Sequence, residues 1–205
     1  DLAKIGSRCR EIQATFILDA TQSLGALPFS VREVQPDFLI AAGYKWLFGP
    51  YSLGFMYVSP RYQGGKPLEH NWINRKNSQD FAGLVNYRDE FQPGARRFDV
   101  GERSNFVLMP MAKTALQQIL DWKVSEIAST LSQMTDQIAD RANELGLNVA
   151  PAHQRAGHML GLRFPEKMSA DLVDRLSEKK IYVSVRGNSI RVSPHLYNTG
   201  QDIEK

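Results

Sequence analysis

The fold is decided by the stretch "FILDATQSLGALPFSVREVQPDFLIAAGYKWLFGPYSLGFMYVSP", residues 16–60. Three short apolar runs in it, "FILDA", "DFLIAA" and "LGFMYVSP", indicate β-strands, and "SVREV" between the first two indicates a brief helical turn. Strand, short helix and strand in succession, with nearly continuous apolar strands, are typical of a layered sheet buried on both faces. We therefore predict an α/β fold for this part of the chain.

Two reactive side chains stand where the first two strands end. Asp19 closes the first strand, which the pattern predicts to be buried, and Lys45 follows the second strand, ahead of two aromatic residues. Ligands of α/β sheets gather at the carboxyl ends of the strands. The sequence thus predicts an acid and an amine on the same rim of the sheet.

Helices and a second sheet are expected on either side of this stretch. "LAKIGSRCREIQ" has helical spacing, residues 60–96 are rich in Gly, Asn and Pro and indicate a connection, and "SNFVLMPMAKTALQQILDW" begins a long helix. A second long helix follows, with Gly146 as its C-terminal glycine. We expect the first domain to end at residue 92, and residues 93–205 to form a small domain that includes the linking helices.

The small domain is predicted to be α+β. "HMLGLRF" indicates a strand, "SADLVDRLSEKK" a helix with Ser169 as its N-cap, and "IYVSVRGNSIRVSP" a hairpin that turns at Gly187 and Asn188. A strand, a capped helix and a hairpin can form one small sheet covered by helices.

Composition excludes several classes of protein. The 205 residues are 42% hydrophobic and 23% charged, which is ordinary for a globular chain, and the net charge of +3 comes from scattered basic residues. We therefore expect no nucleic-acid partner. No run approaches the ~20 apolar residues of a membrane span, so we expect no membrane partner. The single cysteine, Cys9, fits a reducing compartment, and we expect a cytoplasmic location.

Lys45 is the residue that suggests chemistry. Lysine is rarely buried without a partner, and burial disfavours its charged form. A neutral amine can form a Schiff base with an aldehyde. The aldehyde cofactor pyridoxal phosphate also needs a carboxylate at its pyridine nitrogen, a partner for its phenolic oxygen, anchors for its phosphate, and a cation for the substrate carboxylate.

The sequence offers one candidate for each of these needs. Asp19 can serve the pyridine nitrogen, Gln22 the phenolic oxygen, Tyr44 the phosphate, and Arg191 in "SIRVSP" a bidentate clamp on the substrate carboxylate. Each residue alone also has a structural interpretation: a helix cap, a solvated rim lysine, a packed tyrosine or a salt-bridged arginine. Their joint order and spacing favours the site.

Segments around these candidate residues resemble those of a known family. "ILDATQSLGALPFSV", "PDFLIAAGYKWLFGPYSLGFMYVSP", "RFDVGERSN" and "IRVSPHLYNTGQDIEK" are similar to segments of the class V aminotransferase family of fold-type I pyridoxal-phosphate enzymes. That family includes cysteine desulfurases, selenocysteine lyases, kynureninases and isopenicillin N epimerase-like proteins. Its pattern of Asp-x-x-Gln (or His) followed by a lysine after the next strand matches Asp19, Gln22 and Lys45 in order and spacing.

The resemblance implies a role for each matched residue. Lys45 would be the Schiff-base lysine and proton shuttle at the substrate α-carbon, Asp19 would hold the pyridine nitrogen, Gln22 the phenolic oxygen, and Arg191 the α-carboxylate of a small amino-acid substrate. The implied fold is the C-terminal part of a fold-type I large domain followed by an α+β small domain. The implied assembly is a homodimer of the full-length protein.

Two departures from the family pattern affect the phosphate site. A hydroxyl of the family's Gly-Thr segment reaches the phosphate of the neighbouring subunit, and here "GERSN" leaves Ser104 or Asn105 for that role. Many members also carry Ser-x-His before the lysine, where this chain has Ala42 and Tyr44. A tyrosine at that position is kynureninase-like, whereas Gln22 is unlike kynureninases, so the subfamily stays open.

Three functional hypotheses follow. The first is a pyridoxal-phosphate enzyme acting at the α-carbon by transamination, epimerisation or a related step. Desulfurase activity is not expected, because no cysteine precedes the Arg191 segment and Cys9 lies upstream of Asp19. The second hypothesis is a kynureninase-like hydrolase, and the third is a non-catalytic module that keeps only the fold.

Two further expectations concern the histidines and the length. His153 and His158 lack the helical spacing of a metal site, and we expect no metal and a structural role for His195. Family members are longer, so we expect this chain to be a C-terminal half that is a poor catalyst alone. We also expect it to expose apolar surface and to have some tendency to self-associate.

Overall fold

A computed structural model describes all residues from 1 to 205. The chain divides into two compact units, one made of residues 1–25 and 29–119 and the other of residues 26–28 and 120–205. This division by packing lies inside a helix. The predicted boundary at residues 92 and 93 refers to the domains of a family enzyme and stays a prediction.

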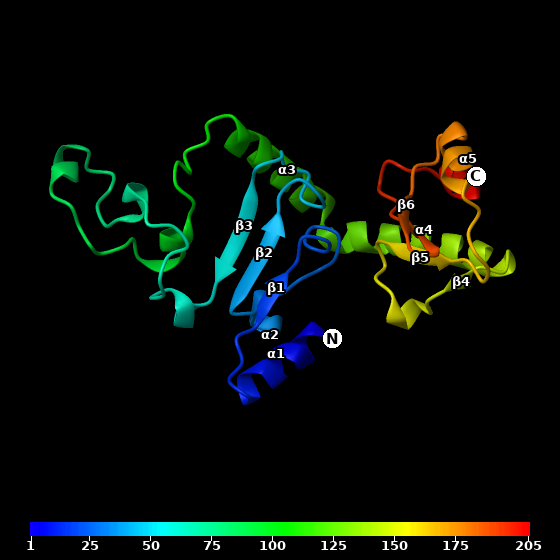
Figure 1. Cartoon of the computed structure of the whole chain (residues 1–205), viewed down its shortest axis with the longest axis horizontal. Coiled ribbons are helices and arrows are strands. Elements are labelled where there is room, and N and C mark those ends of the chain that lie inside the picture. The colour runs from blue at the N-terminus through cyan, green and yellow to red at the C-terminus, as the bar shows by residue number, and fades with distance from the viewer. The chain divides into compact units, whose positions relative to one another are not determined.

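The first unit contains a three-stranded sheet and three helices (Figure 1). Its elements are α1 (Leu2–Glu11), β1 (Ile17–Asp19), α2 (Val31–Val34), β2 (Phe38–Ala42), β3 (Gly54–Val58) and α3 (Leu108–Trp122), the last of which continues into the second unit. Side chains of Asp1 and Ser30 accept hydrogen bonds from first-turn amides and start α1 and α2. The predicted strand, short helix and strand are confirmed.

The sheet has the order β1-β2-β3. β1 runs parallel to β2, with Asp19 opposite Ile40, and β3 runs antiparallel to β2. The prediction that the strands are buried on both faces is wrong for this chain, since Ile17 is 62% and Ile40 37% exposed. The register of β1 and β2 puts Ile17 and Ile40 on the same face of the sheet, and this face is less covered than the other, on which Leu39 is 5% exposed.

The segment between β3 and α3 is irregular, as its Gly, Asn and Pro content predicts. It contains four 3-10 turns, at Pro60–Tyr62, Trp72–Asn74, Ala82–Val85 and Gly94–Phe98. Asn74 holds it together, because its fully buried amide donates to the carbonyls of Arg97 and Asp99 and accepts from Arg103. A buried amide with these partners satisfies backbone groups that have no strand or helix to pair with.

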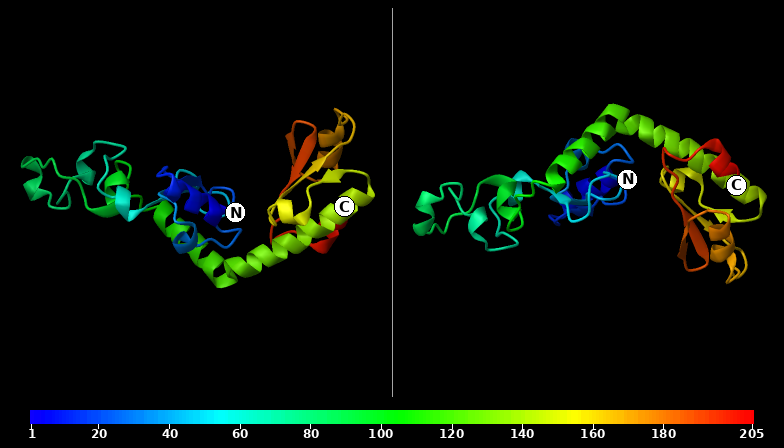
Figure 2. Two further views of the ribbon diagram at one scale, coloured as in Figure 1. Left: turned by 90° about the horizontal axis from the view of Figure 1, so that it is seen from below. Right: turned by 90° about the horizontal axis from the view of Figure 1, so that it is seen from above.

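The second unit is an antiparallel sheet with helices. Its elements are α4 (Val124–Glu144), β4 (Asn148–Val149), a 3-10 turn (Ala152–Gln154), β5 (Leu160–Arg163), α5 (Leu172–Glu178), β6 (Ser184–Arg186), β7 (Ser189–Val192) and α6 (Gly200–Glu204). The strand order is β4-β5-β7-β6. Figure 2 shows the long helix α4 running along this sheet in both views. The hairpin predicted at Gly187 and Asn188 joins β6 to β7 and is confirmed.

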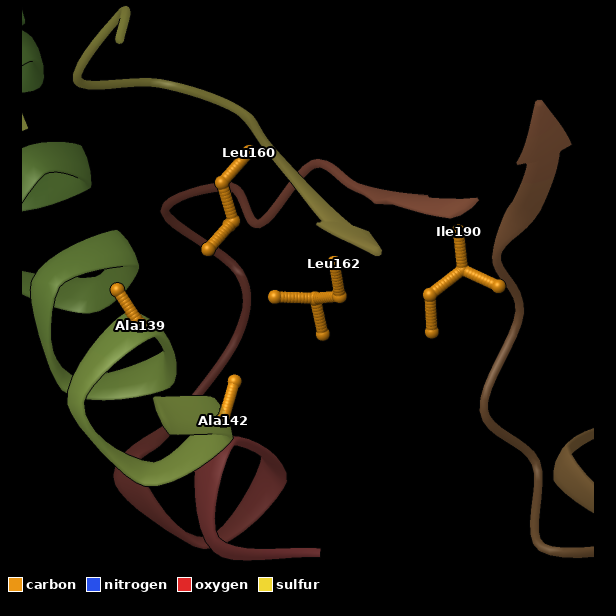
Figure 3. Packing of buried hydrophobic residues seen from close by; sticks show 5 residues of the cluster. All are labelled: Ala139, Ala142, Leu160, Leu162 and Ile190. Atoms are coloured by element: carbon orange, nitrogen blue, oxygen red, sulfur yellow. The ribbon is translucent and has the colours of Figure 1, made fainter. Parts of the chain in front are cut away.

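The core of this unit lies between α4 and the sheet. Ala139 and Ala142 of α4 face Leu160 and Leu162 of β5, with Ile190 of β7 beyond them (Figure 3). Alanine on the helix face allows the backbone of α4 to approach the branched side chains of the sheet closely, which a core at native density requires.

One of the two predicted helix ends is confirmed. Gly146 adopts a φ of +78° just after α4, so it provides the left-handed residue that ends the helix. Ser169 is not the N-cap of α5, because that helix begins at Leu172 after Asp171, and the Ser169 hydroxyl instead donates to the Asp171 carboxylate. None of the helices has the length and apolarity needed to cross a membrane.

Candidate functional site

The turn after β1 positions Asp19. The Ala20 amide donates to the Ile40 carbonyl over 2.8 Å, which extends the pairing of β1 with β2 by one residue. The Thr21 amide then donates to the Asp19 carboxylate over 2.9 Å, and the Thr21 hydroxyl accepts from the Ala42 amide over 3.0 Å. Asp19 is therefore held at the carboxyl end of the parallel strand pair.

A tight loop after β2 positions Lys45. The Gly49 amide donates to the Gly43 carbonyl over 2.8 Å, and the Gly43 amide donates to the Leu53 carbonyl over 2.8 Å. A Cβ at Gly49 would lie 2.9 Å from the Gly43 carbonyl oxygen, so the loop closes only with glycine there. Lys45 is half-buried at the tip of this closed loop.

Electrostatics links Asp19 to Lys45. The pKa of Asp19 lies below its ordinary value, chiefly because the Thr21 hydroxyl and then the Thr21 amide hydrogen-bond its carboxylate. Desolvation opposes this shift, and the positive charge of Lys45 makes the smallest contribution, which also lowers the pKa of Asp19. The structure thus brings the acid and the amine within electrostatic reach of each other on the same rim.

Aromatic rings flank the lysine. The ring of Tyr44 stacks on that of Tyr51, with centroids 4.4 Å apart and planes 17° apart. The Nζ of Lys45 lies 5.8 Å from the centroid of the Tyr44 ring, within cation–π range. Tyr44 therefore has a fixed ring beside the amine, and the use of its hydroxyl as a phosphate anchor stays a prediction.

The other predicted cofactor residues lie in the same unit. Gln22 is exposed in the turn after β1. The side-chain oxygen of Asn105 accepts from the Leu108 amide over 2.8 Å and caps α3, while Ser104 just before it is exposed. Asn105 thus has a helix-capping role that its place in "GERSN" does not reveal, and Ser104 has the more accessible side chain of the two.

Arg191 belongs to the second unit. It lies in β7 opposite Gly161 of β5 and Ser184 of β6, and it is half-buried. None of the ion pairs of the chain uses its guanidinium. His195, for which we expect a structural role, is buried, accepts from the Leu196 amide through Nδ1, and has a pKa lowered by desolvation.

Two residues of this site were missed by sequence reasoning. Thr21 touches both Asp19 and the strand that leads to Lys45, and Tyr51 stacks on Tyr44. A signal for the Thr21 amide existed, because an aspartate side chain in a turn often accepts from the backbone amide two residues on. No local signal identifies Tyr51, since its stacking depends on how the Lys45 loop closes.

The chain is similar to known proteins along its whole length. The family model described as "Aminotransferase class-V" matches residues 1–205, the whole chain. The chain belongs to the class-V aminotransferase family. The resemblance inferred from the motifs around Asp19, Lys45 and Arg191 is therefore confirmed.

Individual relatives of this class-V chain are named for different activities. The chain is 28% identical over 205 aligned residues to the uncharacterized aminotransferase YcbU of Bacillus subtilis. The aligned region covers 99% of this chain and 52% of YcbU. The chain is 47% identical over 58 residues to the cysteine desulfurase IscS of Histophilus somni, a match to 28% of the chain and 14% of that protein. The class-V chain spans about half the length of YcbU.

A solved structure confirms the fold. A C-DES mutant with glycine covalently linked to its PLP cofactor superposes with a TM-score of 0.80 at 21% identity, covering 99% of this chain and 54% of that one. The expected α/β unit and α+β unit are thus those of a fold-type I enzyme. At this identity the likeness concerns the fold alone.

Proposed function

We propose that this chain forms the lysine-bearing part of a pyridoxal-phosphate enzyme that acts at the α-carbon of a small amino acid. The observation that carries this proposal is the placement of Asp19 at the carboxyl end of β1 and of Lys45 in the loop after the parallel strand β2. Membership of the class-V family supports the same reaction class.

The residues present fit pyridoxal phosphate. The cofactor's pyridine nitrogen carries a positive charge when protonated, and Asp19 is kept ionised to meet it. Gln22 would donate to the phenolic oxygen, and Tyr44 with Ser104 or Asn105 would serve the phosphate. When bound, the cofactor supplies an electron-withdrawing ring that stabilises negative charge at the substrate α-carbon.

Each residue then has a task in the chemistry. Lys45 would hold the cofactor through its amine and afterwards carry a proton to or from the α-carbon. Asp19 would keep the proton on the ring nitrogen. Arg191, whose guanidinium has no ion pair in the chain, would bind the substrate α-carboxylate through two parallel hydrogen bonds.

Transamination, epimerisation or a related step is favoured over desulfuration. A desulfurase needs a mobile cysteine near the Arg191 segment, and the only cysteine, Cys9, lies half-buried in α1. A kynureninase-like hydrolase is the second candidate, because Tyr44 precedes the lysine. We propose a homodimer in the cytoplasm for the whole protein, in line with the single cysteine and the phosphate role of the Ser104 segment.

Reductive trapping tests the proposal. The full-length protein would be incubated with pyridoxal phosphate, reduced with borohydride and digested. The peptides would then be analysed by mass spectrometry. We expect one pyridoxyl adduct on the Lys45 peptide, which disappears in Lys45→Ala and persists in Lys113→Ala, an exchange of an exposed lysine on α3. Adducts spread evenly over surface lysines would overturn the enzyme assignment and leave the non-catalytic module.

A further inference from the structure

Thr21 occupies a junction between the two proposed catalytic strands. Its backbone amide donates to the Asp19 carboxylate over 2.9 Å. Its hydroxyl oxygen accepts from the amide of Ala42, the last residue of β2, over 3.0 Å. Ala42 stands three residues before Lys45, so one residue contacts both the acid and the strand that leads to the amine, the first through its backbone amide and the second through its hydroxyl.

The hydroxyl of Thr21 can both accept and donate a hydrogen bond. As an acceptor it satisfies the Ala42 amide, which lies beyond the last residue pair of β1 and β2. The Thr21 side chain is also the first cause of the lowered pKa of Asp19, ahead of the Thr21 amide. Valine keeps the shape of threonine but lacks both capacities, whereas serine keeps both.

We propose that Thr21 is a positioning residue, which orients the Asp19 carboxylate for a cationic ring nitrogen and ties it to the strand carrying Lys45. The inference rests on the proposed function, because only a cofactor gives Asp19 a partner to be aimed at. The contacts by which Thr21 holds Asp19, called the hold below, belong to this chain and exist without the cofactor.

Because Asp19 is an acid, the effect of the hold on its carboxyl can be followed as a function of pH. A carboxyl whose folded pKa is depressed contributes its interactions above the unfolded pKa, and loses them as the pH falls through the folded pKa. The charged side chain that acts on Asp19 is Lys45, and it favours the ionised form as well. Removing the hydroxyl bond therefore moves the protonation of Asp19 to higher pH.

Nuclear magnetic resonance of the full chain without cofactor tests the hold. In Thr21→Val the carboxyl pKa of Asp19 should rise toward its ordinary value of 3.8, and the Ala42 amide should exchange about fivefold faster, since a bond of about 1 kcal/mol is lost. Thr21→Ser should restore both readouts. Thr21→Ala is the second variant if valine disturbs folding, and Thr114→Val on α3 is the matched control.

Each outcome decides the matter. If Thr21→Val leaves both the Asp19 pKa and the Ala42 exchange unchanged, or if Thr21→Ser behaves like Thr21→Val, the positioning role is overturned. A raised pKa together with about tenfold weaker cofactor binding supports it, in line with a charge-assisted bond. A raised pKa in a protein whose wild type shows no adduct at Lys45 supports the hold on Asp19 and overturns the proposed function instead.

Discussion

Asp37 shows how one buried acid can organise the base of the sheet. Its carboxylate accepts from the Phe16 amide over 2.9 Å and from the Ser59 hydroxyl over 3.3 Å, and its Oδ1 lies 3.3 Å from Nε of Arg61. Its amide also donates to the Phe16 carbonyl. The side chain therefore joins the start of β1, the start of β2 and the end of β3.

We predict that Asp37→Ala lowers the free energy of unfolding of the chain by about 2–3 kcal/mol, because a buried amide loses its charged acceptor. Asp37→Asn should cost less, since it keeps one acceptor oxygen. Urea denaturation followed by circular dichroism measures the change. Asp89→Ala removes an exposed carboxylate and is the control; equal losses in the two alanine variants would contradict the role given to Asp37.

At the scale of elements, the turn after β1 and the Lys45 loop pack against each other through a glycine. Gly25 has a φ of +97°, a conformation that side chains disfavour. A Cβ at this position would lie 2.4 Å from the carbonyl oxygen of Trp46, the residue after Lys45. The two loops that bear Asp19 and Lys45 can approach only because residue 25 has no side chain.

Gly25→Ala should therefore disturb the site as well as the fold. We expect a loss of about 2–3 kcal/mol in unfolding free energy, since both the clash and the left-handed backbone oppose alanine, and we expect less pyridoxyl adduct at Lys45. Thermal unfolding and reductive trapping measure the two effects. In Gly64→Ala a Cβ would meet no atom within 4 Å, so this variant should match the wild type in both assays.

At the scale of the whole chain, β1 is the exposed edge of the first sheet. It pairs with β2 alone, and Ile17 on it is 62% exposed. An edge strand with a free hydrogen-bonding side and an exposed apolar residue can add a strand from another molecule. The expectation of self-association therefore has a structural location.

Ile17→Lys should weaken self-association of the 205-residue chain, because a charged side chain on an edge strand disfavours pairing. Analytical ultracentrifugation over a range of concentrations would show a lower average mass for the variant. Ile12→Lys changes an isoleucine that is 56% exposed just after α1 and serves as the control. If both variants associate as the wild type does, another surface is responsible.

Local patterns predicted the elements of this chain well. Apolar runs and turn residues correctly placed β1, β2, β3 and β5, the long helices, the Gly146 helix end and the hairpin at Gly187. Helix starts were less predictable, because Ser169 and Asp171 are both good capping residues and lie only two positions apart. Burial was mispredicted at Ile17, since an apolar strand looks the same whether or not a neighbour covers it.

The candidate site was also predicted only in part from the sequence. The sequence by itself determined the family and the candidates Asp19, Gln22, Lys45 and Arg191, because order and spacing along the chain carry that information. The link that Thr21 makes between the acid and the lysine-bearing strand, and the stacking of Tyr51 on Tyr44, became visible in the folded chain alone. These contacts depend on the register of neighbouring strands and on the closure of the Lys45 loop, and both arise from pairing between residues that are distant in sequence.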